Sequence, residues 1–541
     1  MKNNYTRFLP NHLQIFTILL ALILVLGISF RFVNIEQKSY WDDEAFTSLR
    51  ISGYTEYTVV EKVASIEKIS VKDLKQYQNI NAEKNLFDTL HSLALEDPQH
   101  PPAYYVITWI WVHLFGNSIT AFRTISAVLS LLVFPAVYWL CRELFDSLST
   151  GLIAIGIMAV SPFHILYAQE ARQYSLWTGL ILLSSASLLT AKRLNTKLSW
   201  GIYAAILAFS FYTFPSSIIV AAAHGVYLIT IEKWRFTKGL ISYILAVTGA
   251  FILFMPWIFV ILASLKHINK IVGGQGSMPR LSLIKTWAFN LSRIFIDSNQ
   301  EGVVINFGFE NPITQLFQIF LVGLLVLLSG YAVYFVCRYT AKETWIFILS
   351  LILITSLPII GKDLISGGSR SIILRYFIPA YLGIQICIAY LLANGIISKP
   401  VQARFWKVVI CLLFTGAIFS NFVSFQASSW WTKSHSDVTY QAAKFINQAE
   451  KPLLISDGSM GMILALSHQL KPEVQLQLKP YCHTCREIPN VLVNKNILTV
   501  ADGFDNFLFA PSESLLQEFN QMDKYLIQPV SSQLWQIKDK N

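Results

Sequence analysis

Long apolar runs, separated by short polar connections, fill most of the sequence up to about residue 429. Most of them approach the twenty or so residues that a helix needs to cross the hydrocarbon core of a membrane. The runs lie at 12–33, 119–140, 149–168, 174–190, 200–213, 215–231, 239–264, 313–337, 344–360, 372–395 and 406–426. This pattern predicts an all-α polytopic membrane protein with about eleven transmembrane helices.

One further apolar segment, 101–116, is too short to cross a membrane. If it lies in the interface, every connection rich in Lys and Arg faces the cytoplasm, as such connections usually do. We therefore interpret it as an interfacial helix with aromatic side chains at the level of the lipid headgroups, namely Tyr104, Tyr105, Trp109 and Trp111. The first run lacks the cleavage site of a signal peptide, so we expect a retained span with a cytoplasmic N-terminus.

This orientation puts three polar segments on the extracytoplasmic side, at 34–118, 265–312 and 427–541. Within the first, residues 57–77 carry apolar positions at helical spacing between Lys and Glu, which is typical of a helix lying on the membrane surface. We expect this helix to serve packing rather than chemistry.

The C-terminal tail has the alternating pattern of a small α/β unit. Strand-like runs at 452–456 and 496–500 alternate with helical patterns at 436–449, 459–469 and 512–523. The sequence thus predicts two domains, a transmembrane domain over 1–429 and an extracytoplasmic domain over 430–541.

Composition narrows the class of protein further. Apolar residues make up 54% of the chain and charged residues only 14%, which excludes a soluble multidomain protein. The net charge of +10 comes from the membrane part rather than from a basic tail, so we expect no nucleic-acid partner. Cys482 and Cys485 enclose His483, but a zinc site needs two further ligands. We expect a local disulfide or free thiols there, with no catalytic role.

Three adjacent carboxylates, Asp42, Asp43 and Glu44, follow closely after the first span. Acids beside the hydrocarbon edge are costly unless they face a polar cavity, a cation or a reacting hydroxyl. A general base for an acceptor hydroxyl is one interpretation, and a solvated acidic turn is the other. Asp43 and Glu44 also suit a divalent cation, but a base that acts without metal needs the same residues.

Other candidates lie at the same membrane edge. Glu170, Arg172 and Tyr174 connect two spans, and we expect them to converge on a shared cavity. His100, before two prolines, is either a helix-cap residue or a ligand for phosphate or sugar. Arg375, followed by Tyr376, is predicted to hold a buried phosphate, because a guanidinium binds two phosphate oxygens at once. For Arg123, Lys362 and Arg370 we expect snorkelling toward lipid headgroups instead.

These motifs occur in a fixed order along the chain. They are Asp43-Glu44 after the first span, His100-Pro101-Pro102-x-Tyr104-Tyr105, Phe115-Gly116 with Arg123 downstream, Gln169-Glu170-Ala171-Arg172-x-Tyr174, and Arg375-Tyr376-x-x-Pro379-Ala380. The ordered set resembles the dolichyl-phosphate-mannose-protein mannosyltransferase superfamily, glycosyltransferase family 39, with its bacterial aminoarabinose and galacturonosyl transferases of lipid A. The resemblance is strongest over 30–190 and returns at 370–395.

The resemblance implies a type C glycosyltransferase fold, whose active site lies between the first external loop and the membrane surface. Its donor would be a polyprenyl-phosphate-linked sugar. By motif match Asp43-Glu44 is the acidic pair, with Asp43 the base and Asp42 an extra acid, and Arg375 and Tyr376 lie near the lipid phosphate. Segment 265–312 is too short for the large lumenal insert of the eukaryotic protein mannosyltransferases. This favours a bacterial plasma-membrane enzyme and a lipid or glycan acceptor over a protein acceptor.

The chemistry expected of such an enzyme is simple. It deprotonates an acceptor hydroxyl and stabilises the departing lipid phosphate, here through Asp43 and through Arg375 with His100. A single displacement inverts the anomeric centre. A transporter or flippase of lipid-linked saccharides is the alternative, but it needs polar groups at mid-bilayer depth. A non-catalytic scaffold that binds polyprenyl phosphate would have no use for Asp43.

Overall fold

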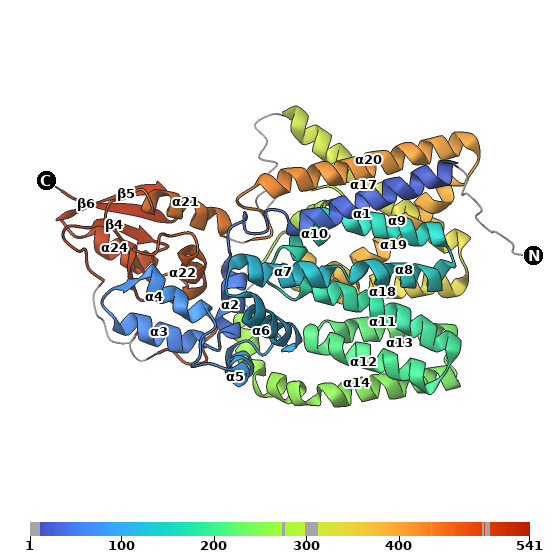
Figure 1. The fold of residues 1–541 in the computed structure, drawn as a ribbon, viewed down its shortest axis with the longest axis horizontal. Coiled ribbons are helices and arrows are strands. Elements are labelled where there is room, and N and C mark those ends of the chain that lie inside the picture. Colours follow the sequence, from blue (N-terminus) through green and yellow to red (C-terminus); the bar gives the residue numbers. More distant parts are fainter. Residues whose placement is uncertain are drawn as a thin grey trace, which may run out of the picture.

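The computed structural model describes residues 11–272, 276–297, 312–433, 435–489, 492 and 498–540. Long helices lie side by side in one bundle, and a mixed sheet with its own helices covers one end of that bundle (Figure 1). The predicted fold class, a polytopic helical membrane protein with a small C-terminal α/β unit, is confirmed.

The bundle is built from apolar helices that follow one another in the chain. They are α1 (Asn11–Phe32), α7 (Ile119–Ser130), α8 (Val133–Phe145), α9 (Leu148–Val160), α10 (Pro162–Ala168), α11 (Tyr174–Leu194), α12 (Lys197–Thr213), α13 (Ser217–Ile231), α14 (Lys238–Ala263), α17 (Pro312–Tyr339), α18 (Lys342–Ser366), α19 (Ile378–Ile396) and α20 (Pro400–Gln426).

The remaining elements form the end of the molecule that carries the sheet. From the first external segment come α2 (Asp42–Ile51), α3 (Glu56–Ser65), β1 (Ile69–Ser70), α4 (Val71–Lys75), η1 (Gln76–Gln78), α5 (Leu86–Glu96) and α6 (Ala103–Phe115). Later segments supply α15 (Leu265–Val272), α16 (Arg280–Arg293), η2 (Arg370–Ile372) and η3 (Leu374–Phe377). The tail forms α21 (Ser436–Ile446), β2 (Pro452–Ser456), α22 (Met460–Ser467), β3 (Gln475–Leu478), β4 (Asp505–Phe509), α24 (Glu513–Asn520), β5 (Tyr525–Ser531) and β6 (Leu534–Asp539).

Each predicted span falls on a helix of the bundle. Within the described residues, seven helical segments are long and apolar enough to cross a membrane, and the pair α9 and α10, bent by 59°, would make an eighth. The bend follows from Pro162, because a proline disfavours helical geometry at the residue before it. The other predicted spans coincide with α1, α12 and α13, which run alongside the long helices (Figure 1). Large apolar side chains such as Leu253 and Phe259 are exposed on the outer helix α14, as expected for a surface covered by lipid.

The spans alternate in direction, with α7 and α8 together forming one of them, so the connections between successive spans lie at opposite ends of the bundle (Figure 1). The five connections rich in Lys and Arg, after α8, α11, α13, α17 and α19, all lie at the end away from the sheet. Their common placement agrees with the orientation predicted from charge.

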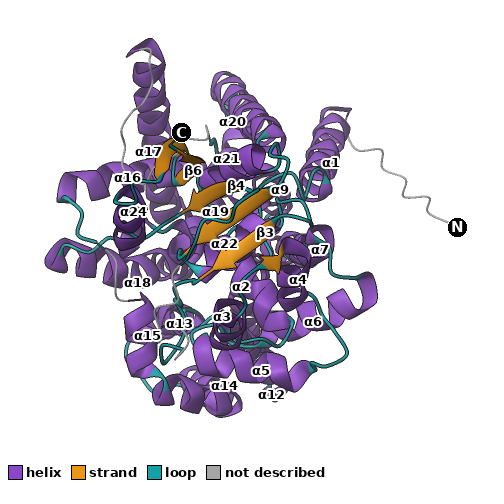
Figure 2. Cartoon of the chain, turned by 90° about the vertical axis from the view of Figure 1, so that its left-hand side faces the viewer, coloured by secondary structure: helices purple, strands orange, loops and turns teal. Residues whose placement is uncertain are grey.

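The sheet joins the first external segment to the tail. Its order is β1-β3-β2-β4-β6-β5, with β2 parallel to both β3 and β4 and the other pairs antiparallel. β1 pairs with β3 through Ile69 opposite Leu476. Since a strand of the first external segment completes the sheet of the tail, the two parts form one layer over the bundle, seen face-on in Figure 2.

The predicted membrane-surface helix over 57–77 is wrong. This stretch forms α3, β1, α4 and η1, and its apolar residues share a buried core with the tail. Val60 and Val63 of α3 are fully buried in the same cluster as Leu464 of α22. The amphipathic pattern correctly marked a buried face, but the sheet covers it instead of lipid.

The tail contains more strands than the sequence pattern predicts. The strand at 452–456 is confirmed as β2, and the three helices appear as α21, α22 and α24. Of the predicted strand at 496–500, residues 496 and 497 lie outside the described residues, and 498–500 are not a strand. Strands β3 to β6 were not predicted. The segment 101–116 does form one short helix, α6, and its Tyr104 and Tyr105 are buried inside the protein.

Candidate active site at the membrane edge

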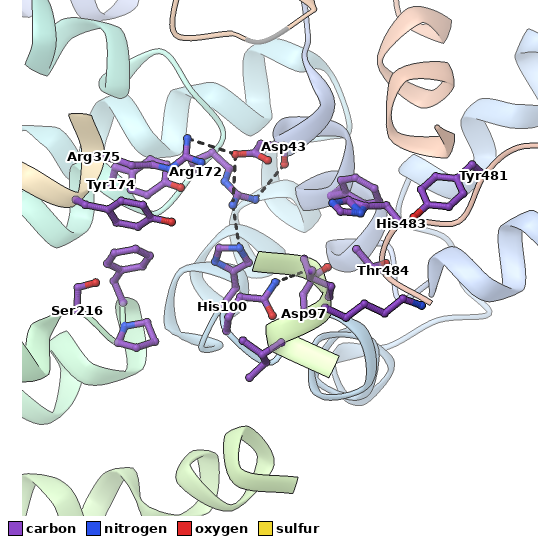
Figure 3. Close-up of a pocket in the computed structure, with 18 residues that line it drawn as sticks. Asp43, Asp97, His100, Arg172, Tyr174, Ser216, Arg375, Tyr481, His483 and Thr484 are labelled. Carbon is purple, nitrogen blue, oxygen red and sulfur yellow. Dashed lines mark hydrogen bonds and ion pairs between the residues drawn. The ribbon is translucent and has the colours of Figure 1, made fainter. Parts of the chain in front are cut away.

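A cavity of about 670 Å³ lies where the helix bundle meets the layer that carries the sheet. Four parts of the chain line it (Figure 3). They are the first external segment with Asp43, Asp97 and His100, the ends of the bundle with Arg172, Tyr174, Ser216, Arg375 and Tyr376, helix α15 with Ile268, Lys270 and Ile271, and the tail with Tyr481, His483 and Thr484. The cavity therefore gathers residues that lie far apart in the sequence.

Asp43 stands at the first turn of α2 and faces two guanidinium groups. Its Oδ2 lies 3.8 Å from Nη2 of Arg172 and 3.9 Å from Nη1 of Arg375. The side chain remains 29% exposed to the cavity. Burial favours the neutral acid, but the charges of Arg172 and Arg375 outweigh it and hold the pKa of Asp43 below its usual value. Asp43 is therefore an ionised carboxylate at neutral pH that is open to a ligand.

Arg172 fixes the geometry around Asp43. Its Nη1 donates hydrogen bonds to the Asp43 carbonyl and to Oγ1 of Thr47, both at 3.1 Å. Its Nη2 lies 3.2 Å from Nε2 of His100, which must accept because a guanidinium only donates. Burial, followed by the Arg172 charge, lowers the pKa of His100 to about 3. His100 is thus neutral at physiological pH and orients Arg172, rather than supplying a positive charge to a departing phosphate.

Arg375 projects free donors into the cavity. Its guanidinium lies 5.5 Å from the centre of the Tyr174 ring and 5.9 Å from that of Tyr376. Within the described part of the chain, its only ion pair is the long one with Asp43, and none of its N–H groups makes a hydrogen bond. Two aromatic rings hold the group in place while its hydrogen-bonding edge stays open, which suits an incoming oxyanion.

Glu44, the neighbour of Asp43, lies outside the cavity. Arg123 binds its two oxygens with Nε and Nη2, each at 2.7 Å, and Lys433 donates to Oε2 at 2.7 Å. The backbone N–H of Ala171 supplies a fourth hydrogen bond at 2.9 Å. Burial opposes ionisation, yet Arg123 and Lys433 lower the pKa of Glu44 to about 2. We assign Glu44 a positioning role, because every lone pair is directed at a protein donor. Arg123 is fully buried, so the prediction that it snorkels is wrong.

Two other predicted acids also lie outside the cavity. Asp42 faces His435 of the tail, with Oδ2 at 3.6 Å from Nδ1. Glu170 is buried, and neither of its oxygens has a hydrogen-bond partner among the described residues. Burial raises the pKa of Glu170 despite the nearby Lys433. The predicted convergence on one cavity therefore holds for Arg172 and Tyr174 but not for Glu170.

The donor set gives little support to a metal ion held by Asp43 and Glu44. Asp43 faces two cationic side chains, and Glu44 is saturated with donors. In the part of the chain that the structure describes, one group of three residues has ligand atoms close enough together to hold a metal ion, namely Glu56, Cys482 and Cys485. Those cysteines form a disulfide, so they are not available as ligands.

Several lining residues escaped the sequence analysis. Asp97 and Ser216 line the cavity from loops without a motif, and Lys433, which binds Glu44 outside the cavity, follows a pair of tryptophans with no motif of its own. Tyr481, His483 and Thr484 belong to the Cys482–Cys485 segment, to which we assigned no role. Their position next to the cavity depends on the pairing of β1 with β3, which local patterns do not reveal.

Comparison with known proteins bears on this site. Residues 99–259 match the family model of the dolichyl-phosphate-mannose-protein mannosyltransferases. The match confirms, over these residues, the resemblance predicted from the ordered motifs. It contains His100, Arg172 and Tyr174 but covers less than a third of the chain, and Asp43 and Arg375 lie outside it. No curated protein matches the chain in sequence.

Solved structures with a similar arrangement have low sequence identity to this chain. ArnT from Cupriavidus metallidurans, bound to undecaprenyl phosphate, is 14% identical with a TM-score of 0.47, over 96% of this chain and 97% of that one. The archaeal oligosaccharyltransferase AglB from Archaeoglobus fulgidus, in complex with an inhibitory peptide and a dolichol-phosphate, is 13% identical with a TM-score of 0.46, over 84% and 64%. The protein O-mannosyltransferase complex Pmt1-Pmt2 of S. cerevisiae, bound to the sugar donor, is 15% identical with a TM-score of 0.32, over 46% and 34%. At these values we draw nothing about the site from them.

Proposed function

We propose that this protein is a membrane glycosyltransferase that moves a sugar from a polyprenyl-phosphate-linked donor to an acceptor hydroxyl. One observation carries the proposal: an ionised carboxylate, Asp43, lies 3.9 Å from the open guanidinium of Arg375 in the wall of a cavity at the membrane edge. The family match over 99–259 supports the same reaction class. We place the transfer on the extracytoplasmic face of the membrane, and the basic connections at the other end of the bundle support this orientation.

The geometry performs the transfer in one displacement. Asp43 accepts the proton of the acceptor hydroxyl while the oxygen forms a bond to the anomeric carbon. The bond between that carbon and the phosphate oxygen breaks, and its electron pair stays on the lipid phosphate. Arg375 stabilises the charge that develops there, and Arg172 holds the helix turn that carries Asp43. Attack and departure on opposite sides invert the anomeric centre.

Transfer is tested directly with the purified protein in proteoliposomes. The assay supplies a panel of radiolabelled undecaprenyl-phosphate sugars together with a membrane extract, and follows the label into lipid, glycan and protein fractions. Label in a new glycosidic product supports the transferase. Label that only crosses the bilayer would support the flippase, although the charged groups described here gather at one membrane face rather than at mid-depth.

Replacing Arg375 by Lys is expected to weaken binding of undecaprenyl phosphate about tenfold. An ammonium keeps the charge but loses the paired donors that hold two phosphate oxygens. Native mass spectrometry with undecaprenyl phosphate measures the change. Arg404→Lys, an exposed arginine at the far end of the bundle, is the matched control and should bind like the wild type. Equal losses in both variants would remove Arg375 from the phosphate site.

The pH dependence of transfer reports which acid is the base. Because the pKa of Asp43 lies below its usual value, the carboxylate stays ionised as the pH falls from 7, and the rate should drop only below about pH 4. Single-turnover transfer over a pH series provides the measurement. A loss of rate centred near neutral pH would point instead to Glu170, whose pKa is raised by burial.

A further inference from the structure

The segment Tyr481–Cys485 of the tail forms a small loop closed by the Cys482–Cys485 disulfide. The loop docks on a buried carboxylate of the first external segment, Glu56. The backbone N–H groups of His483 and Thr484 donate to Glu56 at 2.9 and 2.6 Å, and Oγ1 of Thr484 donates to it at 2.6 Å. A short loop thus places three donors on one carboxylate, which only a fixed backbone conformation allows.

The same docking point is tied to the wall of the cavity. Arg50 of α2 donates to Oγ1 of Thr484 at 2.7 Å, and its other nitrogens bind Glu96 at 2.6 Å and Asp97 at 2.5 Å. Asp97 lines the cavity, as do Tyr481, His483 and Thr484. The disulfide loop is therefore connected to the cavity through fully buried Arg50 on the helix that carries Asp43.

The loop and the phosphate site lie at opposite ends of the cavity. Arg375, Tyr174 and Ser216 lie on one side, at the ends of the bundle helices, and Tyr481, His483 and Thr484 lie on the other (Figure 3). Asp43 lies between them. A donor with a polyprenyl tail must enter from the bilayer side, so its phosphate occupies the Arg375 end. The hydroxyl that Asp43 deprotonates must then approach from the side of the loop.

We propose that the disulfide-closed loop Tyr481–Cys485 is the acceptor-binding wall of the site, and that it selects a saccharide acceptor. This inference rests on the proposed transferase function. The loop end offers an aromatic ring, Tyr481, which is 59% exposed, together with the imidazole of His483 and the amide of Gln99. Asp97 is neutralised by Arg50. A flat ring beside hydrogen-bonding groups, with the ammonium of Lys270 also lining the cavity, suits the hydroxylated face of a sugar better than an apolar acceptor.

The test separates acceptor from donor dependence in the full-length protein. Transfer is measured in proteoliposomes with a radiolabelled undecaprenyl-phosphate sugar while the amount of membrane extract is varied, and then with the donor varied at fixed extract. Aqueous and lipid fractions of the extract distinguish a free glycan from a lipid-linked one. Tyr481→Ala and the double variant Cys482→Ser/Cys485→Ser are each expected to need about tenfold more extract for half-maximal transfer, the effect of losing one or two acceptor contacts. The donor concentration that gives half-maximal transfer should stay within about twofold of the wild-type value.

Two matched variants control the experiment. Tyr440→Ala removes another exposed tyrosine of the tail, and Cys411→Ser removes an exposed free cysteine of α20. Both should behave like the wild type, and dithiothreitol should shift the acceptor dependence of the wild type toward that of the double variant.

The outcomes distinguish this inference from the proposed function. A wild-type protein that transfers no sugar would overturn both. An active wild type whose acceptor dependence is unchanged in Tyr481→Ala and in the double variant would overturn the loop assignment alone. A parallel rise in donor and acceptor requirements would also overturn it, because it would show a general structural role. Label that moves only into protein would overturn the saccharide class.

Discussion

Replacing Asp43 by Asn is expected to lower sugar transfer by about 10²–10⁴-fold, the usual contribution of a general base. Asparagine has nearly the same shape but cannot accept the proton of the acceptor hydroxyl. The backbone carbonyl of Asp43, not its side chain, receives the hydrogen bond of Arg172, so the turn of α2 should stay in place. Thermal stability should therefore be close to that of the wild type. Binding of undecaprenyl phosphate should not weaken, because the variant removes a negative charge 3.9 Å from Arg375, and initial-rate transfer assays measure the loss of transfer.

Asp42→Asn is the control that decides between neighbouring carboxylates. Asp42 lies outside the cavity and faces His435, so it does not accept the proton of the acceptor hydroxyl. The transfer rate of Asp42→Asn should therefore stay within about threefold of the wild-type rate. If Asp42→Asn were inactive and Asp43→Asn active, the base would be Asp42. If both variants transferred normally, the carboxylate cluster would have no part in the chemistry.

The sequence indicated the acidic cluster but could not show which of its three acids faces the cavity. Successive residues of a helix point about 100° apart, so three adjacent acids cannot face one cavity. In α2, Asp42 turns to the tail, Asp43 to the cavity and Glu44 to the protein interior. That division depends on how α2 is rotated against its neighbours. Its rotation is set by Arg123 and Lys433, which approach from distant parts of the chain.

The transmembrane helices could be predicted from the sequence more completely than the layer outside the membrane. A transmembrane helix is marked by its own composition, so all the predicted spans fall on helices. The core outside the bundle depends on non-local pairing, since Ile69 of β1 meets Leu476 of β3. An amphipathic pattern such as that over 57–77 shows that one face is buried but does not identify what covers it.

Replacing Glu44 by Gln is expected to reduce the free energy of unfolding by about 3–5 kcal/mol, the cost of removing one partner of a buried ion pair. In the wild type, Glu44 is the common counter-charge of Arg123 and Lys433. In the variant both cations would stay buried and charged without it. Chemical denaturation in detergent, followed by tryptophan fluorescence, measures the loss. Stability that differs by less than about 1 kcal/mol from the wild type would mean that the ion pair is worth no more than a surface pair.

The same pair predicts an acid sensitivity. The pKa of Glu44 is about 2 in the folded protein and 4.5 as a free side chain, so its stabilisation is fully present above about pH 4.5 and is lost as the pH falls toward 2. Glu44→Gln should therefore flatten the stability profile in that window.

Adding Lys433→Met to Glu44→Gln should restore part of the stability at neutral pH, because one of the two unpaired charges is removed. Lys433→Met alone should cost less than Glu44→Gln, since Arg123 still binds both oxygens of Glu44. The helix that carries Asp43 is thus held by charges that take no part in the proton transfer.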